Sequence, residues 1–120
     1  MPRRVLDVGN CAADHASIRR LIENQFDAVV DQANTMAQTV AAIEATEFDL
    51  ILVNRILDRD HSDGLDVIRH VHSSGVPVMM ITNYAQHQQR AQDSGAVPGF
   101  GKAELQSPET TERLAAFLAQ

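Results

Sequence analysis

A run of four apolar residues, Leu50 to Val53, constrains the fold more than any other stretch of the chain. The run is too short for an isolated helix, and it is apolar at every position, so a strand built from it must be covered on both faces. Strands of this kind are typical of parallel sheets with helices on both sides. The run, beginning at Asp49, therefore predicts a central strand of a parallel sheet.

The rest of the chain alternates between short apolar runs and segments with helical periodicity. The predicted strands are residues 5–8, 28–30, 49–53, 78–82 and 96–101. The predicted helices are one capped by Asp14 or Ser17, then 33–46, one between Gly64 and Gly75, 84–93, and one from Ser107-Pro108 onward. Five strands alternating with five helices predict an α/β fold with a doubly wound parallel sheet, in one domain over residues 1–120.

The composition argues against nucleic-acid-binding, membrane-bound and disulfide-stabilised proteins. The formal net charge is −6 and Lys102 is the only lysine, which argues against a broad nucleic-acid footprint. No apolar run approaches the length that spans a bilayer, so no membrane partner is expected. The single cysteine, Cys11, excludes an intramolecular disulfide and fits a reducing cytosol, which predicts a cytoplasmic protein. The oligomeric state is left open.

Polar residues follow the ends of the predicted strands. Gly9 and Asn10 end the first strand, Asn54 the third, Thr82 the fourth, and Lys102 follows the fifth. In open α/β sheets, ligands and chemistry are found at the carboxyl ends of the strands. We therefore expect these residues to form the functional site.

This set resembles the receiver domain of bacterial two-component response regulators, over nearly the whole chain. Thr82 lies in VMMITN, Lys102 comes seven residues after Gly95, and Asp63-Gly64-Leu65 resembles the loop before the third helix. The resemblance implies a flavodoxin-like receiver topology with strand order 2-1-3-4-5. It also implies protein partners in a bacterial signalling pathway. In the family, an aspartate ending the third strand accepts phosphate and an acidic pair ending the first strand binds magnesium.

The departures from the family pattern decide the predicted function. Asn54 stands at the phosphoacceptor position, and an amide has no anionic oxygen to attack a phosphoryl donor. Gly9 and Asn10 stand at the acidic pair, so magnesium binding is expected to be lost or weak. Only Thr82 and Lys102 remain from the switch, and neither a cofactor nor enzymatic activity is expected. The chain is predicted to be a degenerate receiver, or pseudo-receiver.

The resemblance also implies a contact surface on the fourth helix, fifth strand and fifth helix. The polar fourth helix fits an exposed face, and the candidate residues are Gln86, His87, Gln89, Arg90 and Phe100. The expected function is therefore phosphorylation-independent interaction with a protein partner. Gly99 is assigned to the position of the family's switch aromatic residue, with Phe100 one step on.

Several alternatives stay open. Asp58 or Asp60 can accept phosphate in place of Asn54, which keeps a relocated switch. Asp7 either has a basic partner or stands in for a missing acid. A flavodoxin-like small-ligand binder ranks last, because the loop after the first strand has one glycine and an acid beside the proposed anion.

The sequence allows more than one role for each of two further residues. Lys102 can bond Asn54 or a backbone carbonyl, or be solvated. Cys11 is either a reactive thiol or a small buried loop residue.

Overall fold

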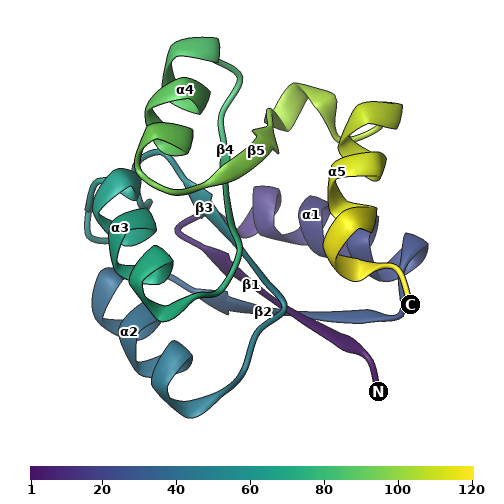
Figure 1. Ribbon diagram of the computed structural model, residues 1–120, viewed down its shortest axis with the longest axis horizontal. Coiled ribbons are helices and arrows are strands. Elements are labelled where there is room, and N and C mark those ends of the chain that lie inside the picture. Colours follow the sequence, from purple (N-terminus) through teal and green to yellow (C-terminus); the bar gives the residue numbers. More distant parts are fainter.

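The computed structural model describes residues 1–120. Five of its segments form one parallel sheet in the strand order β2-β1-β3-β4-β5 (Figure 1). The strands are β1 (Arg3–Val8), β2 (Ala28–Ala33), β3 (Leu50–Asn54), β4 (Val78–Ile81) and β5 (Val97–Phe100). The helices are α1 (Ala12–Gln25), α2 (Met36–Ala45), α3 (Gly64–Ser74), α4 (Ala85–Asp93) and α5 (Pro108–Leu118), with a short 3₁₀ turn at Lys102–Glu104. The predicted fold class and strand order are confirmed.

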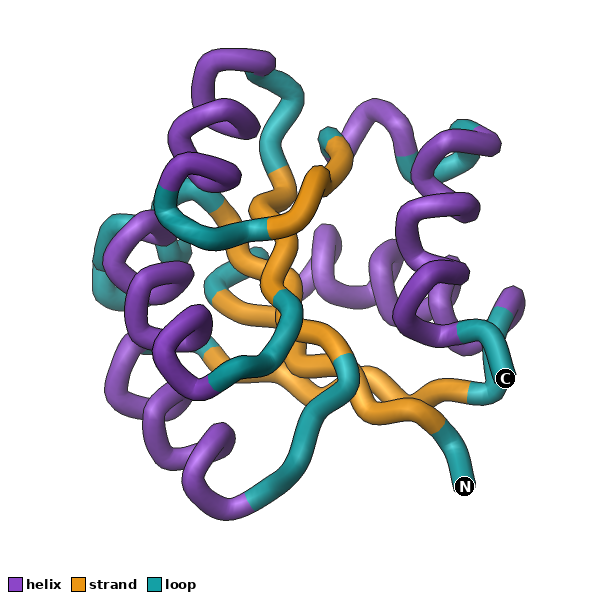
Figure 2. Tube along the Cα trace, in the orientation of Figure 1, coloured by secondary structure: helices purple, strands orange, loops and turns teal.

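Helices cover the sheet on both faces (Figures 1 and 2). Helices α2, α3 and α4 pack on one side, where Val67, Ile68 and Val71 of α3 meet the sheet. Helices α1 and α5 pack on the other side, where Ile22 and Leu114 lie in the second core cluster. This arrangement is the three-layer sandwich that doubly wound sheets adopt.

Strand β3 lies at the centre of the sheet, between β1 and β4. All four residues of the Leu50 to Val53 run are fully buried. Leu50 and Leu52 belong to the core on the α1 and α5 side, and Ile51 and Val53 belong to the opposite core. The prediction of a strand buried on both faces is confirmed, and the residue at its carboxyl end is Asn54.

Helix α1 begins earlier than predicted. Its N-cap is Cys11, which makes no side-chain cap bond, and Asp14 lies in the first turn. Ser17 lies inside the helix and its hydroxyl donates to the carbonyl of Ala13 at 3.2 Å. The prediction that Asp14 or Ser17 caps this helix is therefore wrong. None of the helices combines the length and the apolar composition that crossing a bilayer requires.

Candidate functional site

Three of the predicted site residues line one pocket at the carboxyl edge of the sheet. Asn54, Thr82 and Lys102 share this pocket of about 180 Å³ with Arg55 and neighbouring residues of the β4–α4 loop. Parallel strands bring their carboxyl ends to the same edge, which explains why residues far apart in the sequence meet there. Thr82 is nearly buried, and its hydroxyl oxygen accepts a hydrogen bond from the Tyr84 amide at 3.3 Å.

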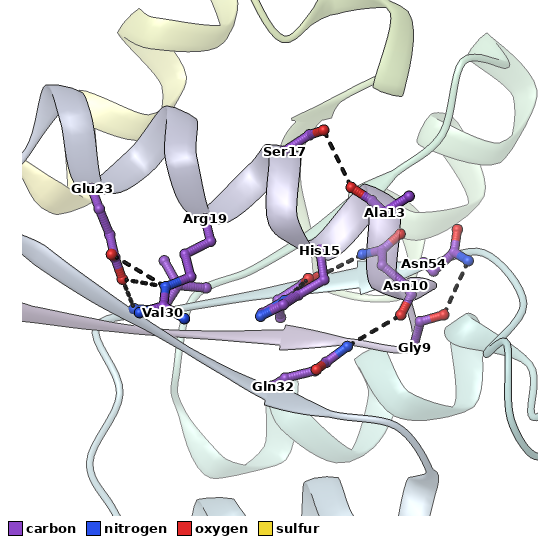
Figure 3. A network of polar contacts seen from close by, with 11 residues as sticks. Gly9, Asn10, Ala13, His15, Ser17, Arg19, Glu23, Val30, Gln32 and Asn54 are labelled. Atoms are coloured by element: carbon purple, nitrogen blue, oxygen red, sulfur yellow. Dashed lines mark hydrogen bonds and ion pairs between the residues drawn. The ribbon is translucent and has the colours of Figure 1, made fainter.

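Asn54 uses its side-chain amide as a hydrogen-bond donor. Its Nδ2 donates to the carbonyl of Gly9 at 3.2 Å (Figure 3) and to the carbonyl of Ile56 at 2.9 Å. Its Oδ1 accepts from the Arg55 amide at 3.1 Å. The Gly9 carbonyl also accepts from the Asp58 amide at 2.9 Å, so Asn54 joins the β1–α1 and β3–α3 loops. An ionised aspartate has no hydrogen to donate to either carbonyl.

Gly9 leaves no room for a side chain. Its φ is +79°, in the left-handed region that favours glycine. A Cβ at this position would lie 2.4 Å from Cγ and 2.9 Å from Cα of Leu57. The β1–α1 turn therefore packs directly on the loop after β3, and an acid at position 9 would meet both backbone strain and a clash.

Asn10 turns away from the pocket toward β1. It is almost completely buried, and its Nδ2 donates to the carboxylate of Asp7. Its backbone carbonyl accepts from Gln32 Nε2 at 3.4 Å, so Asn10 also contacts β2 (Figure 3). The side chain at the second position of the predicted acidic pair thus belongs to a buried polar cluster beneath α1.

Asp7 is the centre of that cluster and has a basic partner. Its carboxylate is completely buried, and Oδ2 lies 2.7 Å from Nδ1 of His15. Of the two alternatives for Asp7, the structure shows the basic partner, and Asn10 takes the other oxygen. Burial raises the pKa of Asp7, although the hydrogen bonds from His15 and Asn10 oppose this rise.

The raised pKa of Asp7 predicts a pH effect. Because the folded state holds this proton more tightly than the unfolded state, the contribution of Asp7 to stability falls as pH rises above 3.8. Denaturant unfolding of the wild type and of Asp7→Asn at several pH values should show the wild type losing stability relative to the variant as pH rises. The acids outside this cluster are the same in both proteins and cancel in the difference. A difference that stays constant, or grows in favour of the wild type, would contradict this account.

Lys102 pairs with a residue that sequence reasoning had placed at a helix cap. Its Nζ lies 2.8 Å from Oδ2 of Asp14, in the first turn of α1. The hydrogen bond from Lys102 holds the pKa of Asp14 below its usual value. Lys102 therefore binds a carboxylate, whereas from the sequence we expected Asn54, a backbone carbonyl or solvent as its partner. Asp14 follows the first strand closely, so it lies at the same carboxyl edge of the sheet as Lys102, and this proximity was the available sequence signal for the pair.

The two acids of the predicted relocated switch lie in the exposed β3–α3 loop, outside the residues that line the Asn54 pocket. The Asp60 carboxylate accepts from the Ser62 amide at 3.0 Å and from the Met36 amide at 3.1 Å. The hydrogen bond from Ser62, followed by that from Met36, lowers the pKa of Asp60. Asp60 thereby ties this loop to the start of α2. Asp58 is exposed, and its amide rather than its carboxylate contacts Gly9.

The predicted contact face on α4 is exposed in part. Gln86, Gln89 and Arg90 are exposed, and His87 is half-buried. Phe100 is only 1% exposed, in the core with Leu114 and Leu118, so its prediction as a surface residue is wrong. The cause is an irregularity in pairing, in which Met79 faces Val97 but Ile81 faces Phe100. This extra residue in β5 reverses the alternation of side chains, so Phe100 points inward.

Gln88, which sequence reasoning had not singled out, fills this irregularity. Its Nε2 donates to the Met80 carbonyl at 2.9 Å, and its Oε1 accepts from the Gly99 amide at 3.1 Å. One side chain from α4 thus bonds a backbone acceptor of β4 and a backbone donor of β5 where the ladder is interrupted. A Cβ at Gly99 would lie 2.2 Å from the Met80 oxygen, so glycine is required beside it.

Replacing Gln88 by alanine is expected to lower the free energy of unfolding by about 2 kcal/mol, because two backbone groups between β4 and β5 lose their partner. Gln92→Ala is the matched control, since Gln92 is an exposed glutamine on the same helix. Urea denaturation of both variants and the wild type measures the effect. Equal stability of the two variants would show that the bridge contributes nothing.

Comparisons with known proteins place these observations in a family. The model of the response regulator receiver domain matches residues 11–104. A putative response regulator from Chloroflexus aurantiacus J-10-fl superposes with a TM-score of 0.85 at 18% identity, and one from Thermotoga maritima with 0.80 at 16%, each covering 100% of both chains. A response regulator from Burkholderia pseudomallei, solved with a phosphorylated aspartic acid, a calcium ion and citrate, gives 0.76 at 20% identity over 98% of this chain and 67% of its own. No curated protein sequence matches the chain.

Proposed function

The chain belongs to the response regulator receiver domain family, and we propose that it is a degenerate member that binds a protein partner without being phosphorylated. Response regulators work with protein partners in bacterial two-component signalling. We therefore expect the partner of this chain to be a protein of such a pathway.

The observation that carries the proposal is the use of Asn54 as a donor. Its Nδ2 donates to the Gly9 carbonyl of the β1–α1 loop and to the Ile56 carbonyl of the β3–α3 loop. A phosphoacceptor must instead present an anionic oxygen to the donor, which an amide does not have. The residue at the phosphoacceptor position is thus part of the loop structure and offers no nucleophile.

The residues around the pocket also do not fit magnesium. This ion is held mainly through carboxylates and water. Gly9 has no side chain, and the Asp7 oxygens are taken by Asn10 and His15. Asn10 donates its Nδ2 to Asp7 and has one neutral oxygen left, the buried and unpartnered Oδ1, so no carboxylate oxygen is free for the ion. We therefore assign no metal-dependent step to this chain.

The surface proposed for the partner comprises α4, β5 and α5. A polar groove of about 410 Å³ runs there, with Gln89 and Gln92 on the α4 side and Pro98 on β5. Arg113 of α5 donates to the Gly99 carbonyl and forms part of the groove wall. Because Arg113 occupies the Gly99 carbonyl, the partner is expected to bind through side chains and not by adding a strand to β5.

The proposal is tested by incubating the protein with acetyl phosphate and magnesium and measuring its intact mass. We expect no phosphoryl adduct, whereas a receiver with its aspartate, used as the positive control, should be labelled. Because acyl phosphates are labile, the result counts when the control is labelled under the same conditions. An adduct mapped to Asp58 or Asp60 would overturn the proposal in favour of the relocated switch.

A further inference from the structure

Four arginines have no acceptor in the structure: Arg20, Arg55, Arg59 and Arg90. Arg3, Arg4, Arg19 and Arg69 form ion pairs, and Arg113 donates to a carbonyl. Arg55, directly after Asn54, and Arg90, on α4, form neither an ion pair nor a side-chain hydrogen bond. Both nevertheless line the same small pocket, between the start of α3 and α4.

One of the residues that line this pocket has a buried polar atom without a partner. His87 also lines it, and the Nδ1 of its ring is buried and makes no hydrogen bond. The ring is held edge-on to Tyr84, with centroids 5.5 Å apart. A buried polar atom without a partner costs about 1–3 kcal/mol, so a polar group that enters from outside and bonds it recovers part of that cost.

The charge of the pocket favours an anion. Asp63 is the one acid among its lining residues, and its Oδ1 accepts from the Leu65 amide as the cap of α3. Two guanidinium groups against one carboxylate leave an excess positive charge here, in a chain whose formal charge is −6. A guanidinium group matches a carboxylate in geometry and charge.

The size of the pocket restricts the anion. Its volume of about 40 Å³ admits a carboxylate group, whereas sites for nucleotide-sized or drug-sized ligands occupy roughly 300–1,000 Å³. We propose that Arg55, His87 and Arg90 bind the carboxylate of an acidic segment on the partner protein. This inference rests on the proposed function and names the chemistry of its partner.

The test uses the full chain labelled with ¹⁵N and hexaglutamate as the probe, titrated at constant ionic strength with hexaglutamine as the neutral comparison. We expect saturable shifts of the Arg55 and Arg90 Nε–Hε signals with hexaglutamate alone. The double variant Arg55→Gln/Arg90→Gln should weaken this affinity at least about tenfold, because both guanidinium partners are lost. Both arginines are exposed, so the backbone amide spectrum should otherwise keep its dispersion.

Arg20→Gln is the matched control, because Arg20 is an exposed arginine without an ion pair and lies outside this pocket. It should bind hexaglutamate as the wild type does. The proposal is overturned by shifts that do not saturate, by equal affinity in the double variant, or by tighter binding of inorganic phosphate, which would indicate a site for small inorganic anions. Any of these results, obtained while acetyl phosphate still leaves the mass unchanged, removes this inference and leaves the proposed function standing.

Discussion

Replacing Gly9 by aspartate is expected to lower the free energy of unfolding by about 4 kcal/mol. The backbone at Gly9 has a φ of +79°, which costs a residue with a Cβ about 1–3 kcal/mol. The new Cβ would also lie 2.4 Å from Leu57 Cγ, and forcing extra atoms into a packed site costs about 1–3 kcal/mol more. Chemical denaturation of the variant and the wild type measures the sum.

Gly75 supplies the control that separates strain from clash. Its φ is +86°, but a Cβ there would have nothing within 4 Å. Gly75→Ala should therefore cost only about 1 kcal/mol, through the backbone alone. If Gly9→Asp loses no more stability than Gly75→Ala, the packing of Leu57 on the β1–α1 turn is not what excludes a side chain.

This prediction bears on the proposed function, in which Gly9 takes the position of a family acid. The Gly9 turn approaches Leu57 too closely for any side chain. The Gly9 turn and the loop after β3 thus leave no space for an acidic side chain at this position. Substitution at position 9 alone cannot restore that acid.

The core and the location of the site follow from sequence, because both depend on local pattern. The apolar run at Leu50 to Val53 predicts a strand buried on both faces, and the structure buries all four residues. The convergence of Asn54, Thr82 and Lys102 follows from the rule that parallel strands end at one edge.

The contacts between side chains within the site could not be predicted from the sequence. They depend on how side chains from elements far apart in the chain are oriented toward one another. The Lys102–Asp14 pair joins residues 88 positions apart, and the spacing of neither residue indicates the other. Phe100 was misplaced because one extra residue in β5 reverses the alternation, and the local signal of that irregularity is the Pro98-Gly99 pair inside the strand. Gln88 was missed for the same reason, since its role exists only where the ladder between β4 and β5 is interrupted.

Asn54→Asp is expected to lower the free energy of unfolding by about 3 kcal/mol at neutral pH. The two hydrogen bonds from Nδ2 contribute about 1 kcal/mol each. In addition, the carboxylate places a negative charge against the carbonyl oxygens of Gly9 and Ile56, which accept hydrogen bonds and repel an anion. Urea denaturation at constant ionic strength measures the loss.

Asn24→Asp is the control for the added charge, because Asn24 is exposed on α1 and its side chain makes no hydrogen bond. Because Asn24 lies in the last turn of α1, where a negative charge is unfavourable, the variant should lose no more than about 1 kcal/mol. Acetyl phosphate and magnesium should still leave Asn54→Asp unlabelled, because restoring one carboxylate does not restore the acids at Gly9 and Asn10 that hold the metal in the family. If Asn54→Asp is as stable as Asn24→Asp and becomes labelled in a magnesium-dependent manner, the site needs no other acid. The amide at position 54 would then be the one change that keeps this chain unphosphorylated, and the account of the metal site given above would be wrong.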